Sequence, residues 1–462
     1  MVARELSRLI GAEHVLDAPV GAPYDRDAGR RRGVDSKAEA VARPGSAQEV
    51  AAVVAWCYEH DVPIVPRGGG TGMMGGAVAT HGGVVVSMER LRRVRELEPA
   101  LWRMLPEAGV STRDVQRLAR ENGLMFAPDP GAAEQSQIGG NVATNAGGPH
   151  ALKYGVTGTW VAGLEAVLAP GEVVQVGGWA AKDVAGYDLK SLLIGSEGTL
   201  GLITAVRLKL LPAPEAALAL VVFLRARSEG CEAIETVLGA GLRPSVLDFL
   251  DGETLRMMGA AYGAALGSST RSADVPAEAD FALVIEVDGS REEAHAQREE
   301  LIRTLGSAAL AVDEVEDAQA LWRWRDGING VVTGVRGAKV SEDVVFPLER
   351  LAEGLEGFEA IASEYGMRSC AWGHGGEGNV HATVLVDPEM ESELDASEAV
   401  GEGLFELVVR LGGSVAGEHG VGWLKRGRLA AQWEERAVLL HEQIKQVFDP
   451  KGLLNPGKKL AR

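Results

Sequence analysis

The stretch "PRGGGTGMMGGAV" at residues 66–78 constrains the fold of this chain more than any other feature. Gly70, Gly72 and Gly75 spell G-x-G-x-x-G after a short predicted strand, which is the pattern of a dinucleotide-binding loop. In that loop the glycines open a helix whose N-terminus meets the pyrophosphate. Here the apolar run "GGVVVSM" follows and predicts a strand. The region 92–96 also lacks an acidic residue placed to read a ribose, so a Rossmann-type nicotinamide enzyme is not predicted.

The glycine loop still suits a phosphate, because successive backbone N–H groups form anion-binding nests without a helix. Arg67 stands at its start, where a cation can pair with an anion. A second stretch of small residues and asparagines covers 138–148, and we predict a loop there that lets a flat ligand approach the backbone closely. The alternative is a pair of plain tight turns, but the first run is longer than a turn needs.

Length and charge limit the class of protein. At 462 residues the chain predicts two domains or more. The formal net charge of −19 argues against nucleic acid and against an anionic membrane surface as partners. The longest apolar run, at 216–224, is too short to cross a bilayer, and the first residues lack a signal-peptide pattern. We therefore expect a cytoplasmic protein without a transmembrane segment, or one that is peripheral at the membrane through a partner.

The three cysteines, Cys57, Cys231 and Cys370, are scattered and form no C-x-x-C pair. This usage predicts a reducing compartment and no disulfide framework. It is also too sparse for a cysteine-ligated iron–sulfur cluster, so another chain would carry any such cluster.

The pattern of predicted helices and strands changes near residue 213. Before it we predict helices after Ser46 and over 111–122, a hairpin turning at Pro170–Gly171, and a strand that ends at Pro212. After it, strands such as 281–289 alternate with helices such as 228–239 and 291–305, which predicts an α+β domain with a mostly antiparallel sheet. The predicted domains are 1–213, with a core at about 42–213, then 214–420, and a closing segment at 421–462.

Two histidines bracket the loop "WGHGGEGNVH" at 372–381. If 368–374 and 379–386 form a hairpin in which Trp372 pairs with His381, then His374 and His381 lie diagonally on one face, with Cα atoms roughly 7–8 Å apart. Two imidazoles placed in this way can bind one ion. The alternative is that they only satisfy backbone groups of a glycine-rich hairpin.

A metal site needs a third ligand, and the glycine-rich stretch "GGSVAGEHGVG" at 412–422 supplies Glu418 beside His419. Two histidines and one carboxylate with open positions form a catalytic zinc-type set, which Mn²⁺ or Fe²⁺ would also fit.

Four stretches together resemble the FAD-binding signatures of the vanillyl-alcohol-oxidase superfamily. They are "PRGGGTGMMGGAV", "PDPG…IGGNVATNAGGPHALKYGVTG", "YDLKSLLIGSEGTLGLIT" and "FDPKGLLNPGK". The best match within it is the family of D-lactate dehydrogenases and FAD-linked glycolate oxidase subunits, in the same order from about residue 42 to the C-terminus. The resemblance implies an α+β fold: a PCMH-type FAD-binding domain of two halves, a cap domain with a large antiparallel sheet, and a tail that returns to the first domain.

The resemblance also implies which residues contact FAD. The pyrophosphate set is Arg67, Gly68, Gly69, Gly70, Thr71, Gly72, Gly75 and Gly76. The flavin set is Pro128, Asp129, Ile138, Gly139, Gly140, Asn141, Thr144, Ala146 and Gly147. Glu197, Gly201 and Ile203 are implied at the adenine end through backbone groups, and Asn455 at the isoalloxazine. Some superfamily members attach FAD through a histidine after Arg-Gly-Gly; Gly70 and Thr71 stand there, so we predict non-covalent FAD.

The family signatures "GHxGxGNxH" and "EHGxG" imply His374, His381 and Glu418 as ligands of a divalent metal, Zn or Mn or possibly Fe, and His419 as the base. Asn379, inside the first signature, is predicted to contact the substrate. For the substrate carboxylate, "LWRWRDGINGVV" offers Arg323 and Arg325, and the family pattern favours Arg325 as a bidentate partner. A solvated helix arginine is the alternative.

Lys339 is a further candidate for substrate binding. Family members often place a lysine closer to the following Asp-x-x-x-Pro, where this chain has Ser341 before Asp343 and Pro347. This departure leaves the identity of the substrate open.

The resemblance predicts FAD- and metal-dependent oxidation of a small D-2-hydroxy acid to the 2-oxo acid. D-lactate or glycolate is expected first, with D-2-hydroxyglutarate as a further candidate. Electrons would pass to a separate acceptor: a quinone, a cytochrome, an electron-transfer flavoprotein or an iron–sulfur subunit. A homodimer or a subunit of a complex is expected. The alternatives are an O₂-using oxidase of the same fold and a non-catalytic flavin-binding subunit.

Overall fold

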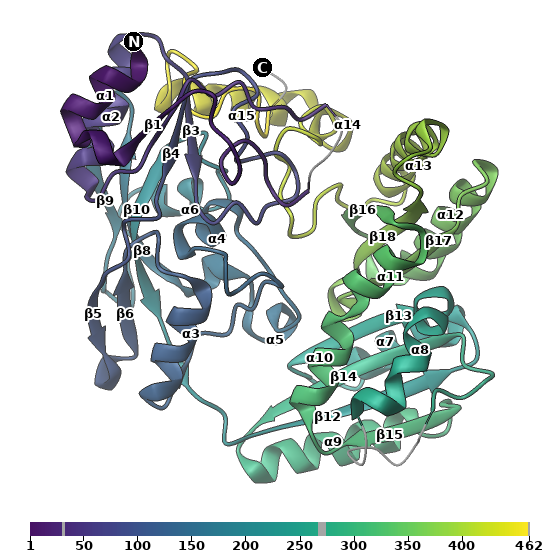
Figure 1. Cartoon of the computed structure of the whole chain (residues 1–462). Coiled ribbons are helices and arrows are strands. Elements are labelled where there is room, and N and C mark those ends of the chain that lie inside the picture. The colour runs from purple at the N-terminus through teal and green to yellow at the C-terminus, as the bar shows by residue number, and fades with distance from the viewer. Residues whose placement is uncertain (30–32, 267–273, 461–462) are drawn as a thin grey trace. The chain divides into compact units, whose positions relative to one another are not determined.

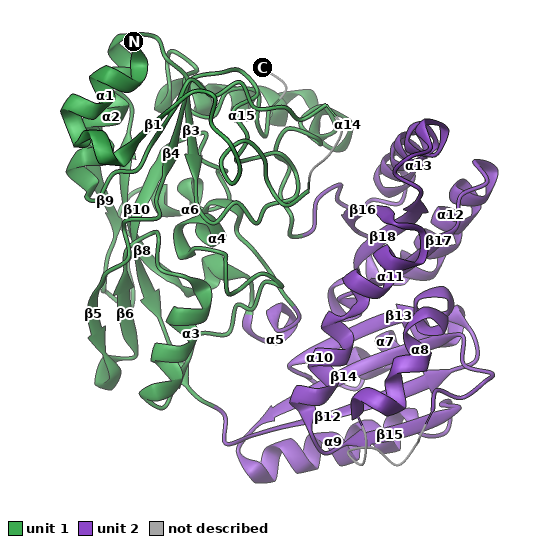
Figure 2. Cartoon of the chain, viewed as in Figure 1, with its two compact units in different colours: residues 1–148, 155–213, 418–462 green, residues 149–154, 214–417 purple. Residues whose placement is uncertain are grey.

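The computed structural model describes residues 1–29, 33–266 and 274–460. The chain divides into two compact units, coloured separately in Figure 2. Unit 1 comprises residues 1–148, 155–213 and 418–462, and unit 2 comprises residues 149–154 and 214–417. Unit 1 therefore combines the glycine loop with the C-terminal segment, whereas unit 2 holds the histidine hairpin.

Unit 1 contains a four-stranded sheet in the order β1-β2-β4-β3. Figure 1 labels three of its strands, β1, β3 and β4. Its strands are β1 (Val15–Asp17), β2 (Ala40–Ala42), β3 (Ile64–Arg67) and β4 (Val84–Ser87). β2 and β3 run parallel to β4, while β1 is antiparallel to β2. Helices α1 (Val2–Ile10) and α2 (Ala47–Glu59) cover this sheet through a core that includes Leu6, Val53 and Val84. Ser46 caps α2 as predicted, because its side chain accepts a hydrogen bond from the Glu49 amide.

A second, antiparallel sheet of unit 1 has the order β5-β6-β10-β8-β9. Its strands are β5 (Val94–Glu98), β6 (Arg103–Pro106), β8 (Val161–Leu168), β9 (Glu172–Gly177) and β10 (Leu202–Lys209). The β8–β9 hairpin turns at Pro170–Gly171, which confirms the prediction. A short pair, β7 (Leu124–Met125) and β11 (Leu211–Pro212), lies apart from both sheets.

The remaining helices of unit 1 are α3 (Thr112–Glu121), α4 (Ile138–Thr144), α6 (Leu189–Leu193), α14 (Leu429–Gln432) and α15 (Glu435–Phe448). The prediction of a loop over 138–148 was wrong for its first half, because residues 138–144 form α4. Glycine at 139 lets this helix pack directly on the backbone near Ala108, since a methyl there would lie 2.6 Å from the Ala108 side chain. Tertiary packing thus overrides the low helix propensity of "IGGNVAT".

Unit 2 is built on a seven-stranded, fully antiparallel sheet in the order β15-β12-β14-β13-β17-β18-β16. The strands are β12 (Ala216–Leu224), β13 (Val246–Asp251), β14 (Phe281–Gly289), β15 (Ala311–Val315), β16 (Ala338–Val345), β17 (Ser369–Gly373) and β18 (Asn379–Val386). This sheet confirms the predicted α+β domain with a large antiparallel sheet.

Helices lie on both faces of that sheet. One face packs against α8 (Gly252–Leu266), α10 (Ala318–Asp326) and α11 (Ile328–Arg336), in a core that includes Val221, Tyr262 and Trp324. The other face packs against α7 (Arg227–Gly239), α9 (Arg291–Leu305), α12 (Leu351–Glu364) and α13 (Glu391–Arg410). The short helix α5 (Ala151–Tyr154) contacts β13. The first face matters for function, because it also carries the histidines.

All three cysteines are buried and free, so no disulfide framework exists, as predicted. Burial raises the pKa of the Cys57 and Cys231 thiols to about 12. Across the described ranges, no helix combines the length and the apolar character needed to cross a membrane.

Candidate functional site

The glycine loop of unit 1 follows β3 and lies against the start of α4. A methyl added to Gly68 would lie 3.5 Å from the Gly140 Cα, and one added to Gly69 would lie 2.0 Å from the Gln135 carbonyl oxygen. Gly70 has a φ of +70°, which favours glycine. Two stretches predicted to contact the cofactor are therefore brought together at Gly68 and Gly140, and at position 69 only glycine fits against the Gln135 backbone.

Arg67 and Asp27 shape this loop from the side of the sheet. The buried Arg67 guanidinium donates hydrogen bonds to the carbonyl oxygens of Pro23 and, at 3.3 Å, Ala77. The Asp27 carboxylate accepts hydrogen bonds from the amides of Gly29 (3.1 Å) and Gly75 (2.6 Å). Arg67 thus spans the loop through backbone carbonyls, and its pairing with an anion stays a prediction. Asp27 lies before residue 42, where the recognisable motifs begin, so sequence reasoning missed it.

Glu197 joins three separate segments of unit 1. Its carboxylate accepts hydrogen bonds from the amides of Val421 (3.0 Å) and Gly422 (2.6 Å), two and three residues after His419. Asn455 donates from its side chain to the backbone oxygens of Gly76 (2.9 Å) and Glu197 (2.7 Å). The glycine loop, the "SEGT" turn, the "EHGVG" turn and the C-terminal tail are therefore fixed to one another.

Buried polar atoms at this junction fit a polar ligand such as FAD. Gln137 Oε1, Ser196 Oγ and Asn455 Oδ1 are buried and have no hydrogen-bond partner among the described residues. Orphaned buried polar atoms cost about 1–3 kcal/mol each and are rare without a ligand or water. Gln137 is adjacent to Ile138 of the flavin set, Ser196 is adjacent to Glu197 of the adenine set, and Asn455 is itself predicted at the isoalloxazine. The donor and acceptor chemistry of unit 1 therefore matches the cofactor that its sequence predicts.

The other predicted FAD residues also belong to unit 1. Asp129 packs on Gly148, where a methyl would lie 2.6 Å from Asp129 Oδ1, and Asn141 donates a hydrogen bond to Thr112 Oγ1 at 2.5 Å. Gly147 packs on Glu418, since a methyl there would lie 2.9 Å from Glu418 Oε2. The other predicted FAD residues lie before α4 (Pro128), in or just after α4 (Ile138, Gly139, Thr144, Ala146), in the glycine loop (Thr71, Gly72), and at the start of β10 (Gly201, Ile203).

A buried cation also lies at the end of the glycine loop. Lys458 Nζ donates hydrogen bonds to the Val78 carbonyl oxygen (2.8 Å) and to Thr80 Oγ1 (3.0 Å). Burial lowers the pKa of Lys458 to about 8. The motif "NPGK" contained this lysine, but its burial follows only from the tertiary structure.

In unit 2, the histidine hairpin has the predicted register. Trp372 pairs with His381 across β17 and β18, so His374 and His381 lie on one face. Both side chains are buried, and their ring centroids are 5.6 Å apart in an edge-on arrangement. The alternative in which both histidines only satisfy the backbone does not describe His374, whose Nδ1 is 2.8 Å from Asp248 Oδ1. This pairing is typical of metal-ligating histidines.

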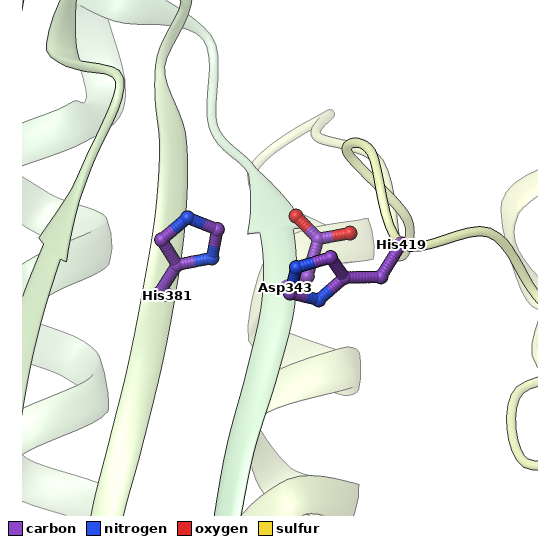
Figure 3. A group of neighbouring side chains, drawn as sticks. All are labelled: Asp343, His381 and His419. Atoms are coloured by element: carbon purple, nitrogen blue, oxygen red, sulfur yellow. The ribbon is translucent and has the colours of Figure 1, made fainter. Parts of the chain in front are cut away.

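Asp343 lies directly opposite His381 on the neighbouring strand β16. Figure 3 draws both side chains, together with His419 of the segment that follows Gly417. The buried Asp343 carboxylate accepts hydrogen bonds from Asn379 Nδ2 (2.7 Å) and from the Gly417 amide (2.9 Å). Asn379 Oδ1 is buried and has no hydrogen-bond partner among the described residues. Asp343 therefore fixes the backbone one residue before Glu418, and Asn379 keeps an acceptor for a ligand.

The two arginines of α10 differ in burial. The Arg323 side chain is 67% exposed, whereas that of Arg325 is 13% exposed and lies 2.6 Å from Asp248 Oδ2. Arg325 is therefore not a solvated helix arginine. Lys339 lies 4.6 Å above the Trp372 ring centroid and donates a hydrogen bond to Asn329 Oδ1 at 2.5 Å. Both predicted cations thus belong to the face of the sheet that carries the histidines.

Asp248 is the residue of this cluster that sequence reasoning missed. Burial opposes its ionisation, but the Arg325 guanidinium and the His374 ring lower its pKa below the usual value. The stretch "SVLDFLDG" holds an aspartate at a position that alternation places among core side chains, and a charged residue in such a run is a signal. Its partners could not be read from the sequence because they come from other elements.

Protein-family comparisons match both parts of the chain. Residues 38–177 match the family "FAD binding domain", and residues 213–459 match "FAD linked oxidases, C-terminal domain". The glycolate oxidase subunit GlcD of Bacillus subtilis is 34% identical over 100% of this chain and 97% of that protein. The D-lactate dehydrogenase of Anaerostipes hadrus is 32% identical over 92% of this chain and 90% of that protein.

Among solved structures, p-cresol methylhydroxylase with substrate bound resembles this chain with a TM-score of 0.80. The likeness covers 99% of this chain and 96% of that chain at 17% identity, so it shows the PCMH-type fold alone. Taken with the family matches, it shows that this chain belongs to the FAD-linked oxidase family and is an FAD-dependent oxidoreductase of the GlcD and D-lactate dehydrogenase type.

Proposed function

We propose that this protein oxidises a small D-2-hydroxy acid to the corresponding 2-oxo acid with non-covalent FAD and a divalent metal. D-lactate or glycolate is the first candidate substrate, and D-2-hydroxyglutarate is a further one. The names of two relatives, a glycolate oxidase subunit and a D-lactate dehydrogenase, support this substrate class. The single observation that carries the metal dependence is the pair His374 and His381, buried on one face with ring centroids 5.6 Å apart.

The proposed metal ligands are His374, His381 and Glu418. The donor set of two imidazoles and one carboxylate fits Zn²⁺ or Mn²⁺, with Fe²⁺ as a further fit. Glu418 follows Gly417 by one peptide bond, and the Gly417 amide is held by Asp343, which lies opposite His381. Consecutive Cα atoms are about 3.8 Å apart, so chain connectivity ties Glu418 to that end of the sheet. A metal bound there would polarise the hydroxyl and carboxylate oxygens of the substrate.

The proposed base is His419, which takes the hydroxyl proton of the substrate. A neutral imidazole carries a ring nitrogen that can accept a proton, which suits a general base. Two residues further on, the amides of Val421 and Gly422 are bound by the Glu197 carboxylate. This anchor limits the motion of the turn that carries His419, and a fixed base needs less reorganisation during proton transfer.

The substrate is proposed to bind through Arg325, Lys339 and Asn379. Arg325 has the planar guanidinium that pairs with a carboxylate in bidentate fashion, and Asn379 Oδ1 is the buried acceptor described above. Ser341, which stands where relatives often have a lysine, hydrogen-bonds Thr383 at 2.8 Å. A substrate with a second carboxylate would therefore find Ser341 in place of that lysine to pair with it. This favours D-lactate and glycolate, which have one carboxylate.

FAD, when bound, would supply the acceptor for the hydride that leaves C2 of the substrate. The residues proposed to hold it are the predicted pyrophosphate, flavin and adenine sets of unit 1, completed by Asn455. A separate acceptor then takes the electrons, because the described residues offer only three buried cysteines and hence no cluster ligand set. The word "subunit" in the name of the Bacillus subtilis relative supports a partner chain in this role.

The test is anaerobic mixing of the purified yellow protein with D-lactate, L-lactate, glycolate and D-2-hydroxyglutarate, while flavin absorbance is recorded. We expect bleaching by a D-acid or by glycolate but not by L-lactate, loss of bleaching after chelation, and recovery with Zn²⁺ or Mn²⁺. A yellow protein that no acid bleaches would rule out the proposed substrate class. Bleaching that survives complete metal removal would rule out the metal.

A further inference from the structure

Two of the proposed site residues meet on one buried carboxylate. Asp248, on β13, has a side chain that is 1% exposed. Its Oδ1 lies 2.8 Å from His374 Nδ1, and its Oδ2 lies 2.6 Å from Arg325 Nη2. One carboxylate therefore contacts both a proposed metal ligand and the proposed partner of the substrate carboxylate.

The sheet register explains the first contact. β13 pairs with β17 so that Phe249 is opposite Gly373 and Leu250 is opposite Trp372. One residue further along, Asp248 comes beside His374. Because side chains alternate between faces, Asp248 and His374 project to the same face as Trp372 and His381. His374 directly follows the last residue of β17, so the strand pairing brings it beside Asp248 one residue beyond the paired positions.

Helix α10 explains the second contact. Trp322 and Arg325 are three residues apart and therefore share one helix face. Trp322 Nε1 donates a hydrogen bond to Glu286 Oε2 on β14 at 2.6 Å, while Arg325 pairs with Asp248 on β13. The helix is held by two buried carboxylates on adjacent strands. Arg325 is therefore fixed in direction before any substrate binds.

The contact to His374 also selects a tautomer. A carboxylate accepts hydrogen bonds, so Asp248 requires the proton of His374 on Nδ1 and leaves the lone pair on Nε2. Metal-ligating histidines commonly bind a carboxylate through the other ring nitrogen in this way, which orients the ring and raises its basicity. Asp248 would therefore present His374 Nε2 as the ligand atom.

We propose that Asp248 is the positioning residue of this site, which prepares His374 for the metal and Arg325 for the substrate carboxylate through its two oxygens. The inference rests on the proposed function, because it deepens the roles given there to His374 and Arg325. It assigns the ligand nitrogen as Nε2, and it predicts that metal affinity and substrate affinity fall together when one oxygen of residue 248 is lost.

The competing explanation is that Asp248 is only structural. A buried ion pair contributes little net stability, because the desolvation of both charges offsets their attraction. A purely structural pair would nevertheless destabilise the fold when broken, so stability alone cannot distinguish the two roles. The test must therefore measure metal binding directly.

The experiment compares Asp248→Asn with the wild-type protein, both with FAD bound and stripped of metal. Zn²⁺ and, separately, Mn²⁺ are titrated against a chromophoric chelator to give the dissociation constant without any assay of activity. We expect one tight site in the wild type and an affinity about 10- to 100-fold lower in Asp248→Asn. At saturating metal, the KM for the hydroxy acid should also rise in the variant.

Glu286→Gln is the matched control. Glu286 is also a buried carboxylate and lies on the next strand. It anchors the same helix through Trp322, and it pairs with His150 at 2.9 Å instead of His374. The control should lose stability as Asp248→Asn does, but keep the wild-type metal affinity. Equal loss of metal affinity in both variants would indicate a general effect of helix α10 and overturn the proposal.

The outcomes separate this proposal from the proposed function. If the wild type binds no metal, the proposed metal site is wrong and the role of Asp248 falls with it. If the wild type binds metal and Asp248→Asn binds it equally well, only the role of Asp248 is wrong. If Asp248→Asn fails to fold, the tautomer of His374 provides the test. ¹⁵N-histidine NMR of the metal-free wild type, with the His374 signals assigned from the His374→Gln variant, should show His374 protonated on Nδ1. Protonation on Nε2 would refute the proposal.

Discussion

The carboxylate of Glu197 binds the backbone amide of Gly422 at 2.6 Å, across 225 positions of sequence. The same carboxylate binds the Val421 amide at 3.0 Å, and Glu197 itself has a positive φ of 54°. A residue other than glycine in this conformation is uncommon and costs about 1 kcal/mol or more. Its side chain offsets that cost by fixing the turn that follows Glu418 and His419.

The first prediction concerns this anchor. Glu197→Ala should lower the free energy of unfolding by about 2–3 kcal/mol, because two buried amides lose a charged acceptor. It should also reduce kcat, because the turn that carries His419 is no longer held. Urea unfolding and steady-state kinetics measure the two effects. Glu197→Gln keeps the length of the side chain and one acceptor, so its free energy of unfolding and its kcat should fall between those of the wild type and Glu197→Ala. A Glu197→Ala variant with wild-type stability and kcat would contradict the role of Glu197.

The second prediction concerns the glycine loop. Gly70→Ala should destabilise the FAD-free protein by about 1–2 kcal/mol, because Gly70 has φ +70° and a methyl there would lie 2.0 Å from Arg67 Nη2. Gly72→Ala is the control, since a methyl at Gly72 meets no atom of the described residues within 4 Å and its φ is not in the left-handed region. Thermal unfolding of the two apo variants should therefore separate them, and equal melting temperatures would show that the close approach of Arg67 is not needed.

The third prediction concerns the proposed base. His419→Gln should reduce kcat by about 10²–10⁴-fold, the usual contribution of a general base, while FAD and metal remain bound. Flavin absorbance, metal content and the rate of anaerobic flavin bleaching check the three statements. The exposed His60, which follows the last residue of helix α2, provides a control, and His60→Gln should leave the bleaching rate unchanged. Loss of metal from His419→Gln would instead identify this residue as a ligand.

The fourth prediction concerns the pH dependence of stability. Burial raises the pKa of Asp251 from 3.8 to about 6, although the carboxylate accepts hydrogen bonds from the amides of Thr254 (2.8 Å) and Ala371 (2.7 Å). The folded protein therefore holds this proton more tightly than the unfolded chain. The resulting contribution to stability is complete below pH 3.8 and is lost as the pH rises to about 6, by about 3 kcal/mol in total.

Urea unfolding of the wild type and of Asp251→Asn at several pH values between 4 and 7 isolates this term. The asparagine cannot titrate, so the stability of the wild type relative to the variant should decrease across that range and level off above pH 6. A constant difference between the two proteins would show that the Asp251 carboxyl has the same pKa in the folded and unfolded states.

Local patterns were enough to predict several elements of this protein. Ser46 and Ser111 cap helices because a hydroxyl binds the free amides of a first turn, and Pro170–Gly171 turns a hairpin because few other pairs adopt that geometry. The pairing of Trp372 with His381 followed from the length of one short loop. These features depend on residues close in sequence, so the sequence by itself determined them.

Contacts between distant segments were decided only by the tertiary structure. Asp248 meets His374 and Arg325 across 126 and 77 positions, and Glu197 meets Gly422 across 225. Helix α4 forms in a stretch with low helix propensity because Gly139 lets it pack on Ala108. Each of these outcomes depends on strand register and on backbone packing between elements. The sequence by itself thus determined the residue types of the site and their local geometry. The fold decided that Asp248 contacts His374 and Arg325 and that Glu197 binds Gly422, because burial and the choice of partner are properties of the assembled core.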